Sequence, residues 1–242
     1  MRALLFDFGG TLDFPRHWLD RFVGHYHGAG LSLSRAELDP AFAAATLAGY
    51  RAGPAIWNYS LRELVAFMVD HQIRFLSNQK MKGHPFYGEP NQLPLIGEMK
   101  HLIQSAFVEE SEIGLARSRG LISTLAQEFR IGVVSNFYGN LERVLDDAGF
   151  GRIITTVADS GRLGVYKPDA GIYAAALAML GAEARAAVMV GDSLSKDCAP
   201  ARRVGMRTVW LRHADATAIE PVEADFTIDT LDELEDVLCR MG

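Results

Sequence analysis

The segment MRALLFDFGGTLD at residues 1–13 decides the fold. Within it, Ala3–Phe8 form a short, mostly apolar run without proline, and Gly9-Gly10 end the run. Such a run predicts a buried β-strand that leads into a turn. Asp7 stands at the end of this strand, where it serves either to cap the turn or to act on a ligand. The rest of the chain is needed to choose between these two roles.

Further short apolar runs follow in the C-terminal half, each next to a segment with helical spacing. The runs are Ile131–Ser135, Ile153–Val157, Ala187–Val190 and Thr208–Leu211, and the helical segments are Gly120–Phe129, Leu141–Gly149, Ala170–Leu180 and Asp197–Val204. Strands that alternate with helices predict βαβ units and a parallel sheet covered on both faces. The expected fold class is therefore α/β, with a Rossmann-like core.

A long block with a different pattern separates the first strand from the second. Its segments with apolar residues at i, i+3 and i+4 are Leu19–His27, Arg35–Tyr50, Leu61–Phe75 and Ile96–Phe107, and Gly and Pro lie between them. This spacing predicts helices. We expect a helical cap at residues 15–114 whose inner face covers Asp7. Two short linkers should join it to a core of residues 1–14 and 115–242.

Composition excludes several classes of protein. The formal charge of -6 and the pI of about 5.6 argue against nucleic-acid binding, which needs a basic face. The N-terminal apolar run is too short for a signal peptide, and no apolar stretch is long enough to span a membrane. We expect a cytoplasmic protein. Cys198 and Cys239 match neither metal nor disulfide spacing, and both are expected to be buried.

Polar residues follow the second strand and precede a later helix. In an open parallel sheet, ligands bind beyond the carboxyl ends of the strands. Ser135-Asn136 offer a hydroxyl and a backbone N–H for an anion, although the same pair is common in turns. Lys167 precedes Pro168 and should be extended, with Pro168 at the first position of the next helix. A solvated surface lysine is the alternative.

Acidic residues follow the fourth strand. In GDSLSKD, Asp192 ends the strand and Asp197 stands near the start of a helix. Two carboxylates near Asp7 would suit a hard cation such as Mg²⁺, although Asp197 alone also fits a helix cap. The combination of four such signals along one sheet edge favours a site over four separate caps and turns.

In this order the motifs resemble those of the haloacid dehalogenase-like (HAD) hydrolase superfamily. The matching segments are FDFGGTL with Asp7, VVSN with Ser135, YKPD with Lys167, and GDSLSKD with Asp192 and Asp197. The resemblance covers residues 1–14 and roughly 115–242. The helical block matches the cap of that family by its position only.

The resemblance implies a role for each matching residue. Asp7 would be the nucleophile that forms an aspartyl intermediate, with Lys167 and Ser135 as its catalytic partners. The substrate would be held by Gly9, Gly10, Ser135, Asn136 and Lys167, and Mg²⁺ by Asp7, the Gly9 carbonyl and Asp192, with Asp197 in support. The expected partner is a small phosphorylated molecule.

One residue departs from the pattern of the family. Most of its phosphatases have a second Asp two residues after the nucleophile, where this chain has Gly9. The lost acid–base group typically contributes about 10²–10⁴-fold to the rate. Asp13 or the cap residues His17, His25 and Tyr50 have the chemistry to replace it.

The resulting prediction is a Mg²⁺-dependent phosphatase, with alternatives left open. One alternative is a low-activity or non-catalytic phosphate-binding or regulatory protein. Another is a 2-haloacid dehalogenase-like enzyme, since a halide leaves without a proton. A phosphonatase-like enzyme would need a cap lysine, for which Lys80, Lys82 and Lys100 are available.

Overall fold

The computed structural model describes residues 2–78, 93–213 and 224–241. Lys80 and Lys82 lie outside the described residues. The chain divides into two compact units. A core unit comprises Met1–Arg16 and Glu112–Gly242, and a helical unit comprises His17–Ser111.

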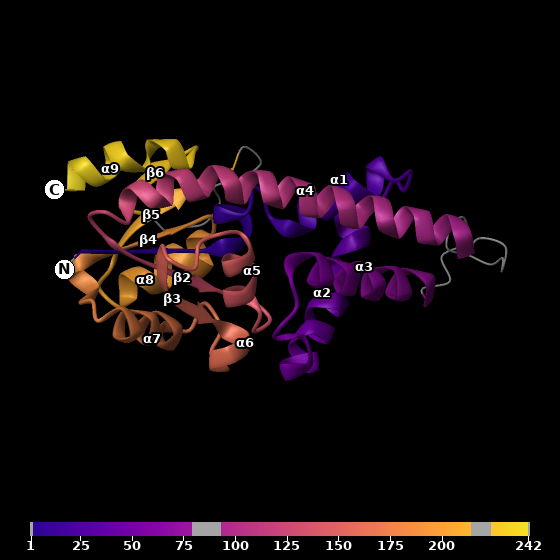
Figure 1. Ribbon diagram of the computed structural model, residues 1–242, viewed down its shortest axis with the longest axis horizontal. Helices are drawn as coiled ribbons and strands as arrows, with labels where there is room; N and C mark the ends of the chain where they lie inside the picture. Colours follow the sequence, from indigo (N-terminus) through magenta and orange to yellow (C-terminus); the bar gives the residue numbers. More distant parts are fainter. Residues whose placement is uncertain (1, 79–92, 214–223, 242) are drawn as a thin grey trace. The chain divides into compact units, whose positions relative to one another are not determined.

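The core unit contains a parallel sheet in the order β3-β2-β1-β4-β5-β6 (Figure 1). The strands are β1 (Ala3–Phe6), β2 (Arg130–Ser135), β3 (Ile154–Asp159), β4 (Ala187–Gly191), β5 (Arg207–Leu211) and β6 (Phe226–Ile228). The predicted α/β, Rossmann-like fold is confirmed. Strand β6 was not predicted, because three residues between acidic neighbours give too short a pattern to detect.

Helices of the core cover the sheet on both faces. They are α5 (Leu141–Asp147), α6 (Ser160–Leu163), α7 (Ala170–Leu180), α8 (Ala199–Arg203), α9 (Leu234–Met241) and the second part of α4 (Leu93–Leu125), with short helical turns at Phe8–Leu12, Ala184–Ala186, Leu194–Cys198 and Leu231–Glu233. Figure 1 shows α9 and this part of α4 on one side of the sheet, and α7 and α8 on the other. Because helices cover both faces of the sheet, side chains on both faces of the strands are buried, and the strands are therefore continuous apolar runs.

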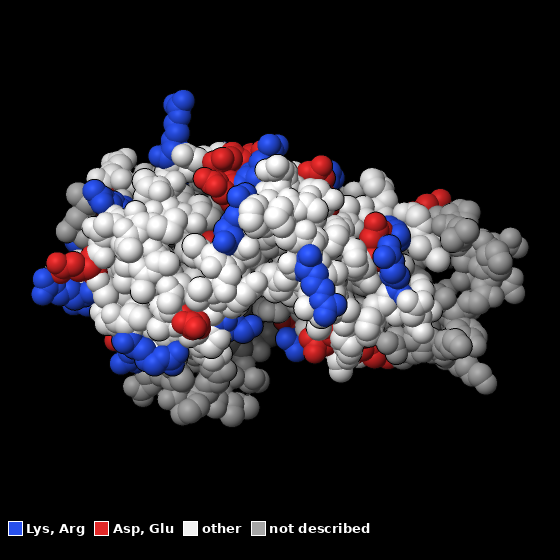
Figure 2. All heavy atoms as spheres, turned by 90° about the horizontal axis from the view of Figure 1, so that it is seen from below, with Lys and Arg blue, Asp and Glu red and all other residues white. Residues whose placement is uncertain are grey.

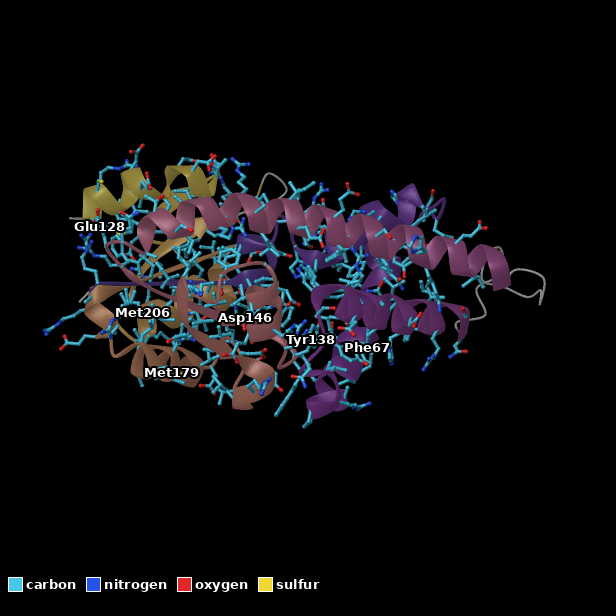
Figure 3. All side chains as sticks on the ribbon, viewed as in Figure 1. Phe67, Glu128, Tyr138, Asp146, Met179 and Met206 are labelled. Atoms are coloured by element: carbon cyan, nitrogen blue, oxygen red, sulfur yellow. The ribbon has the colours of Figure 1, made fainter. Side chains whose placement is uncertain are left out.

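Side chains of β1 illustrate the packing. All four of its residues are buried, and Leu5 shares a cluster with Tyr173 of α7 and Met206. Figure 3 labels Met206 near this cluster and Met179 on the outer side of α7, where it is 53% exposed. Burying a large apolar side chain contributes about 1.5–3 kcal/mol, so this cluster is a main source of core stability.

The start of α7 differs from the prediction. The helix begins at Ala170, and the side chain of Asp169 accepts a hydrogen bond from the N–H of Gly171 at 2.7 Å. Pro168 therefore precedes the cap and is not the first helical residue. Asp is a preferred N-cap because its carboxylate accepts such an orphan N–H. Lys167 and Pro168 are joined by a cis peptide bond.

The helical unit consists of α1 (Trp18–Gly28), α2 (Arg35–Ala52), a short turn at Gly53–Ile56, α3 (Leu61–Asn78) and the first part of α4. Phe22 of α1 stacks on Phe107 of α4, with ring centroids 4.3 Å apart. Arg21 is fully buried beside them, with its guanidinium 3.9 Å from the Phe107 ring centroid. Aromatic and cation–π contacts thus join the ends of this unit.

Helix α4 is longer than predicted. The expected helix Ile96–Phe107 and the first six residues of the expected helix Gly120–Phe129 belong to one helix of 33 residues, which ends at Leu125. This helix passes from one unit into the other between Ser111 and Glu112. The chain therefore returns from the helical unit to the core unit within a continuous helix, and the short linker predicted at this point does not exist. The intervening residues contain no proline, and Gly114 is held within the helix by tertiary packing described below.

Surface features were also predicted in part. Cys198 is buried as expected, but Cys239 is exposed on α9, so that prediction was wrong. On the face shown in Figure 2, positive and negative side chains are interspersed. Within the described part of the chain, no helix is long and apolar enough to cross a membrane.

Candidate active site

Asp7 stands directly after β1, at the carboxyl end of the sheet. Its backbone N–H donates to the carbonyl of Val190 at 2.9 Å, which extends the pairing of β1 with β4 by one residue. Its Oδ1 accepts the N–H of Phe8 at 2.7 Å and lies 2.7 Å from Nζ of Lys167. The side chain is only 10% exposed. Both contacts of this carboxylate are made by one oxygen, Oδ1.

Lys167 joins two carboxylates. Its Nζ lies 2.7 Å from Oδ1 of Asp7 and 2.7 Å from Oδ1 of Asp197, and its side chain is 3% exposed. Burial alone would lower the pKa of Lys167, but the charges of Asp197 and Asp7 outweigh burial and hold it above its usual range. Lys167 therefore places a positive charge directly beside Asp7.

Asn136 has a function that the sequence did not suggest. Its side-chain Nδ2 donates to the carbonyl of Lys167 at 3.0 Å, and its Oδ1 accepts the N–H of Lys167 at 2.7 Å. The amide therefore fixes the backbone of Lys167 at two points. The backbone N–H of Asn136 is the group that the sequence assigns to the substrate, whereas both of these hydrogen bonds are made by its side chain. Ser135 ends β2, the neighbour of β1, and is buried.

Three carboxylates converge beside Lys167. Asp7, Asp192 and Asp197 each offer an oxygen, and these oxygens lie within 4.8 Å of one another. The backbone makes room for them at two glycines. A Cβ on Gly10 would stand 2.4 Å from Oδ2 of Asp192, and one on Gly191 would stand 2.5 Å from Oδ2 of Asp197. Glycine is required at both positions by this close approach.

The cluster fits a divalent cation. Burial raises the pKa of Asp197 to about 7, and the charges of Asp7 and Asp192 raise it while that of Lys167 lowers it. The single ammonium of Lys167 therefore does not neutralise the three carboxylates. Carboxylate oxygens at this spacing are the ligands that Mg²⁺ prefers. Asp197 also accepts the N–H of Ser193 at 3.0 Å through Oδ2, as expected of a supporting residue.

Trp210 in β5 and His213 just after β5 complete the surroundings of Asp192, and neither was identified by the sequence analysis. Nε2 of His213 lies 3.1 Å from Oδ2 of Asp192, and Nε1 of Trp210 donates to its backbone carbonyl at 2.9 Å. His213 follows the end of β5 by two residues. A search for polar residues just past every predicted strand end would have found it.

Comparison with known proteins identifies the family of this chain. The family model of haloacid dehalogenase-like hydrolases matches residues 1–205. The chain belongs to this family. Pyrimidine 5'-nucleotidase YjjG of Escherichia coli is 30% identical over 50% of this chain and 54% of its own length. Phosphoserine phosphatase of Thermus thermophilus is 33% identical over 52% of this chain and 44% of its own. The chain spans about half the length of the curated relatives it matches.

Solved structures show the same fold. A HAD phosphatase from Thermococcus onnurineus has a TM-score of 0.57 at 22% identity, with 98% of each chain covered. A 2-haloacid dehalogenase from Pseudomonas syringae pv. Tomato has a TM-score of 0.54 at 22% identity, with 100% of each chain covered. Both phosphatases and dehalogenases of the family therefore share this architecture.

In this HAD hydrolase, the loop after β2 is held by a buried carboxylate at the end of β3. Asp159 accepts the N–H groups of Gly139, Leu141 and Gly161 at 2.8–3.1 Å. Burial raises the pKa of Asp159, against the effect of these hydrogen bonds. The same loop carries Phe137, whose ring meets that of Phe8 edge to face at 5.2 Å. Nothing in the sequence pattern had indicated Asp159.

The turn Phe8–Leu12 contains Gly9, the residue at which the sequence predicts that an acid–base group is missing. Gly9 has φ −72° and ψ 123°, whereas Gly10 has φ 83°. Asp13, a candidate replacement acid, is fully buried, and its Oδ1 accepts the N–H groups of Gly10 and Phe14 at 2.9 and 2.8 Å. It therefore stabilises the turn.

The candidates in the helical unit are bound locally as well. Nδ1 of His17 accepts the N–H of Leu19 at 3.2 Å and caps α1. Nε2 of His25 lies 2.9 Å from Glu110. Tyr50 belongs to α2 and is partly buried. Neither of these two contacts assigns an acid–base function to its histidine.

Proposed function

We propose that this chain is a Mg²⁺-dependent phosphatase that transfers a phosphoryl group from a small phosphorylated metabolite to Asp7 and then to water, in the cytoplasm. The observation that carries the proposal is the convergence of Asp7, Asp192 and Asp197 beside Lys167. An anionic nucleophile approaches an anionic substrate only if cations offset the repulsion. Lys167 supplies one positive charge, and the acidic cluster would hold the second.

The proposed reaction has two steps. A carboxylate oxygen of Asp7 attacks phosphorus, a phosphorus–oxygen bond forms, and the bond to the leaving oxygen breaks with its electron pair. Water then attacks the same phosphorus, which releases phosphate and restores the carboxylate. Lys167 and the hydroxyl of Ser135 would stabilise the charge on the phosphoryl oxygens, with Asn136 holding Lys167 in place.

The metal would be held by Asp7, Asp192 and the carbonyl of Gly9, with Asp197 in support. When bound, Mg²⁺ would offset the charge of the phosphoryl group and orient it. We also propose that the helical unit acts as a cap over Asp7 and contributes substrate specificity. Curated relatives of the family that act on small phosphate esters support this assignment.

A substrate screen tests the proposal. Phosphate esters, acyl phosphates and 2-haloacids should be offered with and without Mg²⁺ while phosphate and halide release are measured. We expect Mg²⁺-dependent phosphate release that Asp7→Asn abolishes, because an amide is a poor nucleophile. Asp192→Asn should bind Mg²⁺ about 10-fold or more weakly in calorimetric titration. Metal-independent halide release would favour the dehalogenase alternative, which Gly9 permits, and unchanged Mg²⁺ affinity in Asp192→Asn would contradict the metal site.

A further inference from the structure

Gly114 lies inside α4 at a point where the helix touches the turn that follows the nucleophile. A Cβ at this glycine would stand 1.7 Å from the carbonyl oxygen of Asp13 and 2.7 Å from its carbonyl carbon. Both of these atoms are backbone and cannot swing aside. By contrast, a Cβ on Gly120 of the same helix would meet nothing within 4 Å. Only glycine allows the contact at position 114.

A second contact lies about one helical turn further along. Oγ of Ser118 donates to the carbonyl of Leu12 at 2.7 Å, and Ser118 is buried. Helix α4 therefore meets two successive carbonyls of the segment that leaves the nucleophile turn. The steric contact at Gly114 limits how closely the segment approaches the helix. The hydrogen bond from Ser118 fixes the position of the segment along the helix axis.

The position of Asp13 is passed on to the acidic cluster. Its N–H donates to the carbonyl of Phe8 at 3.2 Å, and its Oδ1 accepts the N–H of Gly10 at 2.9 Å. Gly10 in turn lies so close to Asp192 that a Cβ would stand 2.4 Å from its Oδ2. Asp13 is thus hydrogen-bonded to Gly10, and the backbone of Gly10 passes beside the Asp192 carboxylate with no room for a side chain between them.

We propose that Gly114 and Ser118 are positioning residues that set the spacing of Asp7 and Asp192 through Asp13 and Gly10. The proposal rests on the proposed function, because it assigns the two residues to the same metal-binding site. Helix α4 would then do more than pack against the core. It would also set the conformation of the turn after Asp7, and with it the affinity of the site for the cation.

The matched pair Gly114→Ala and Gly120→Ala tests this inference. We expect Gly114→Ala to weaken Mg²⁺ binding about 10-fold in calorimetric titration, the lower end of the effect of residues that support metal ligands. It should lower kcat at saturating Mg²⁺ more than it raises KM, and it should shift the amide resonance of Gly10 in a ¹H–¹⁵N spectrum. Gly120→Ala should leave all three readouts unchanged.

The outcomes separate a positioning role from packing. A folded Gly114→Ala protein with native Mg²⁺ affinity and an unshifted Gly10 amide would overturn the inference, whatever its melting temperature. If the native protein binds no Mg²⁺, the proposed function fails, and the Gly10 resonance still decides whether α4 positions the turn.

A second pair covers the case in which Gly114→Ala does not fold. Ser118→Ala removes the hydrogen bond to Leu12, whereas Ser123→Ala removes a hydrogen bond of equal length, 2.7 Å, to Arg119 within the same helix. We expect weaker Mg²⁺ binding and a shifted Gly10 amide in Ser118→Ala alone. Identical behaviour of the two serine variants would overturn the proposal.

Discussion

Gly9 lies where the proposed nucleophile turn would lack an acid–base group, yet its backbone does not require glycine. Its φ of −72° and ψ of 123° fall in the extended region that every residue adopts. Gly10, with φ 83°, is the residue of this pair that needs glycine. The backbone therefore permits an aspartate at position 9.

Gly9→Asp should accordingly raise the rate on alkyl phosphates by about 10- to 100-fold, the lower part of the usual acid–base contribution. Alkoxide leaving groups need a proton, whereas aryl and acyl phosphates leave as stable anions and should gain much less. Steady-state rates on the three substrate classes measure the difference. Burst kinetics should show accumulated phosphoaspartate in the native protein and none in the variant. Equal gains on every class, or none, would show that residue 9 does not limit the reaction.

Several site residues could be predicted from sequence because each stands immediately after a strand. Asp7 and Asp192 end apolar runs, and parallel strands bring their ends to one edge. The functions of Asn136 and Asp159 could not be predicted in this way. Their hydrogen bonds span 31 and up to 20 residues of sequence, and depend on loop geometry that periodicity does not encode.

Between elements, the contact of α1 with α4 is centred on a buried charge. Nε of Arg21 donates to Oε2 of Glu110 at 2.8 Å, and Nη2 donates to the carbonyl of Phe107 at 3.2 Å. Burial alone would raise the pKa of Glu110, but the hydrogen bonds from His25 and Arg21 outweigh burial and hold it below its ordinary value of 4.5. Glu110 therefore stabilises the folded state above pH 4.5, and this contribution is lost as pH falls through the lower folded-state pKa.

Glu110→Gln should lower the free energy of unfolding at pH 7 by about 1.5–3 kcal/mol, the range for hydrogen bonds to charged groups. Denaturant unfolding followed by tryptophan fluorescence measures it, since Trp18 and Trp57 both belong to the helical unit. The neighbouring exposed residue provides the control, and Glu109→Gln should change stability by less than about 0.5 kcal/mol. The difference between Glu110→Gln and the native protein should shrink below pH 4.5. A constant difference at all pH values would contradict the role of the carboxylate.

Strands and short helices were easier to predict than α4. Two separate helices with a cap boundary between residues 114 and 115 were expected, and glycine at position 114 lowers intrinsic helix stability by about 1 kcal/mol. The structure explains the glycine by the carbonyl that packs on it, a contact between residues 101 positions apart in the sequence. Periodicity identifies helices, but it does not distinguish a glycine that ends a helix from one that allows close packing.

At the scale of the whole molecule, the proposed cap should respond to the state of Asp7. Spin labels at Leu47→Cys in α2 and Leu163→Cys in α6 replace exposed side chains, and Cys239→Ser removes the exposed native thiol. We expect Mg²⁺ with beryllium fluoride, a mimic of phosphoaspartate, to shorten and narrow the distance distribution measured by double electron–electron resonance. Asp7→Asn with the same labels serves as the control. Identical distributions with and without the mimic would contradict a cap that closes over the nucleophile.

The uninterrupted α4 also determines which length changes the molecule can accept. On one side of the crossing the helix carries Glu110 and Ser111, which bind Arg21, and on the other it carries Gly114 and Ser118. Each residue added between these pairs turns one anchor by about 100° relative to the other. One inserted residue therefore changes the direction in which Glu110 and Ser111 face relative to Gly114 and Ser118 along the helix, whereas seven return them to within about 20° of their original alignment. Tolerance of an insertion here should depend on the rotation that it adds to the helix and not on its length. In a surface loop, by contrast, short additions cost least.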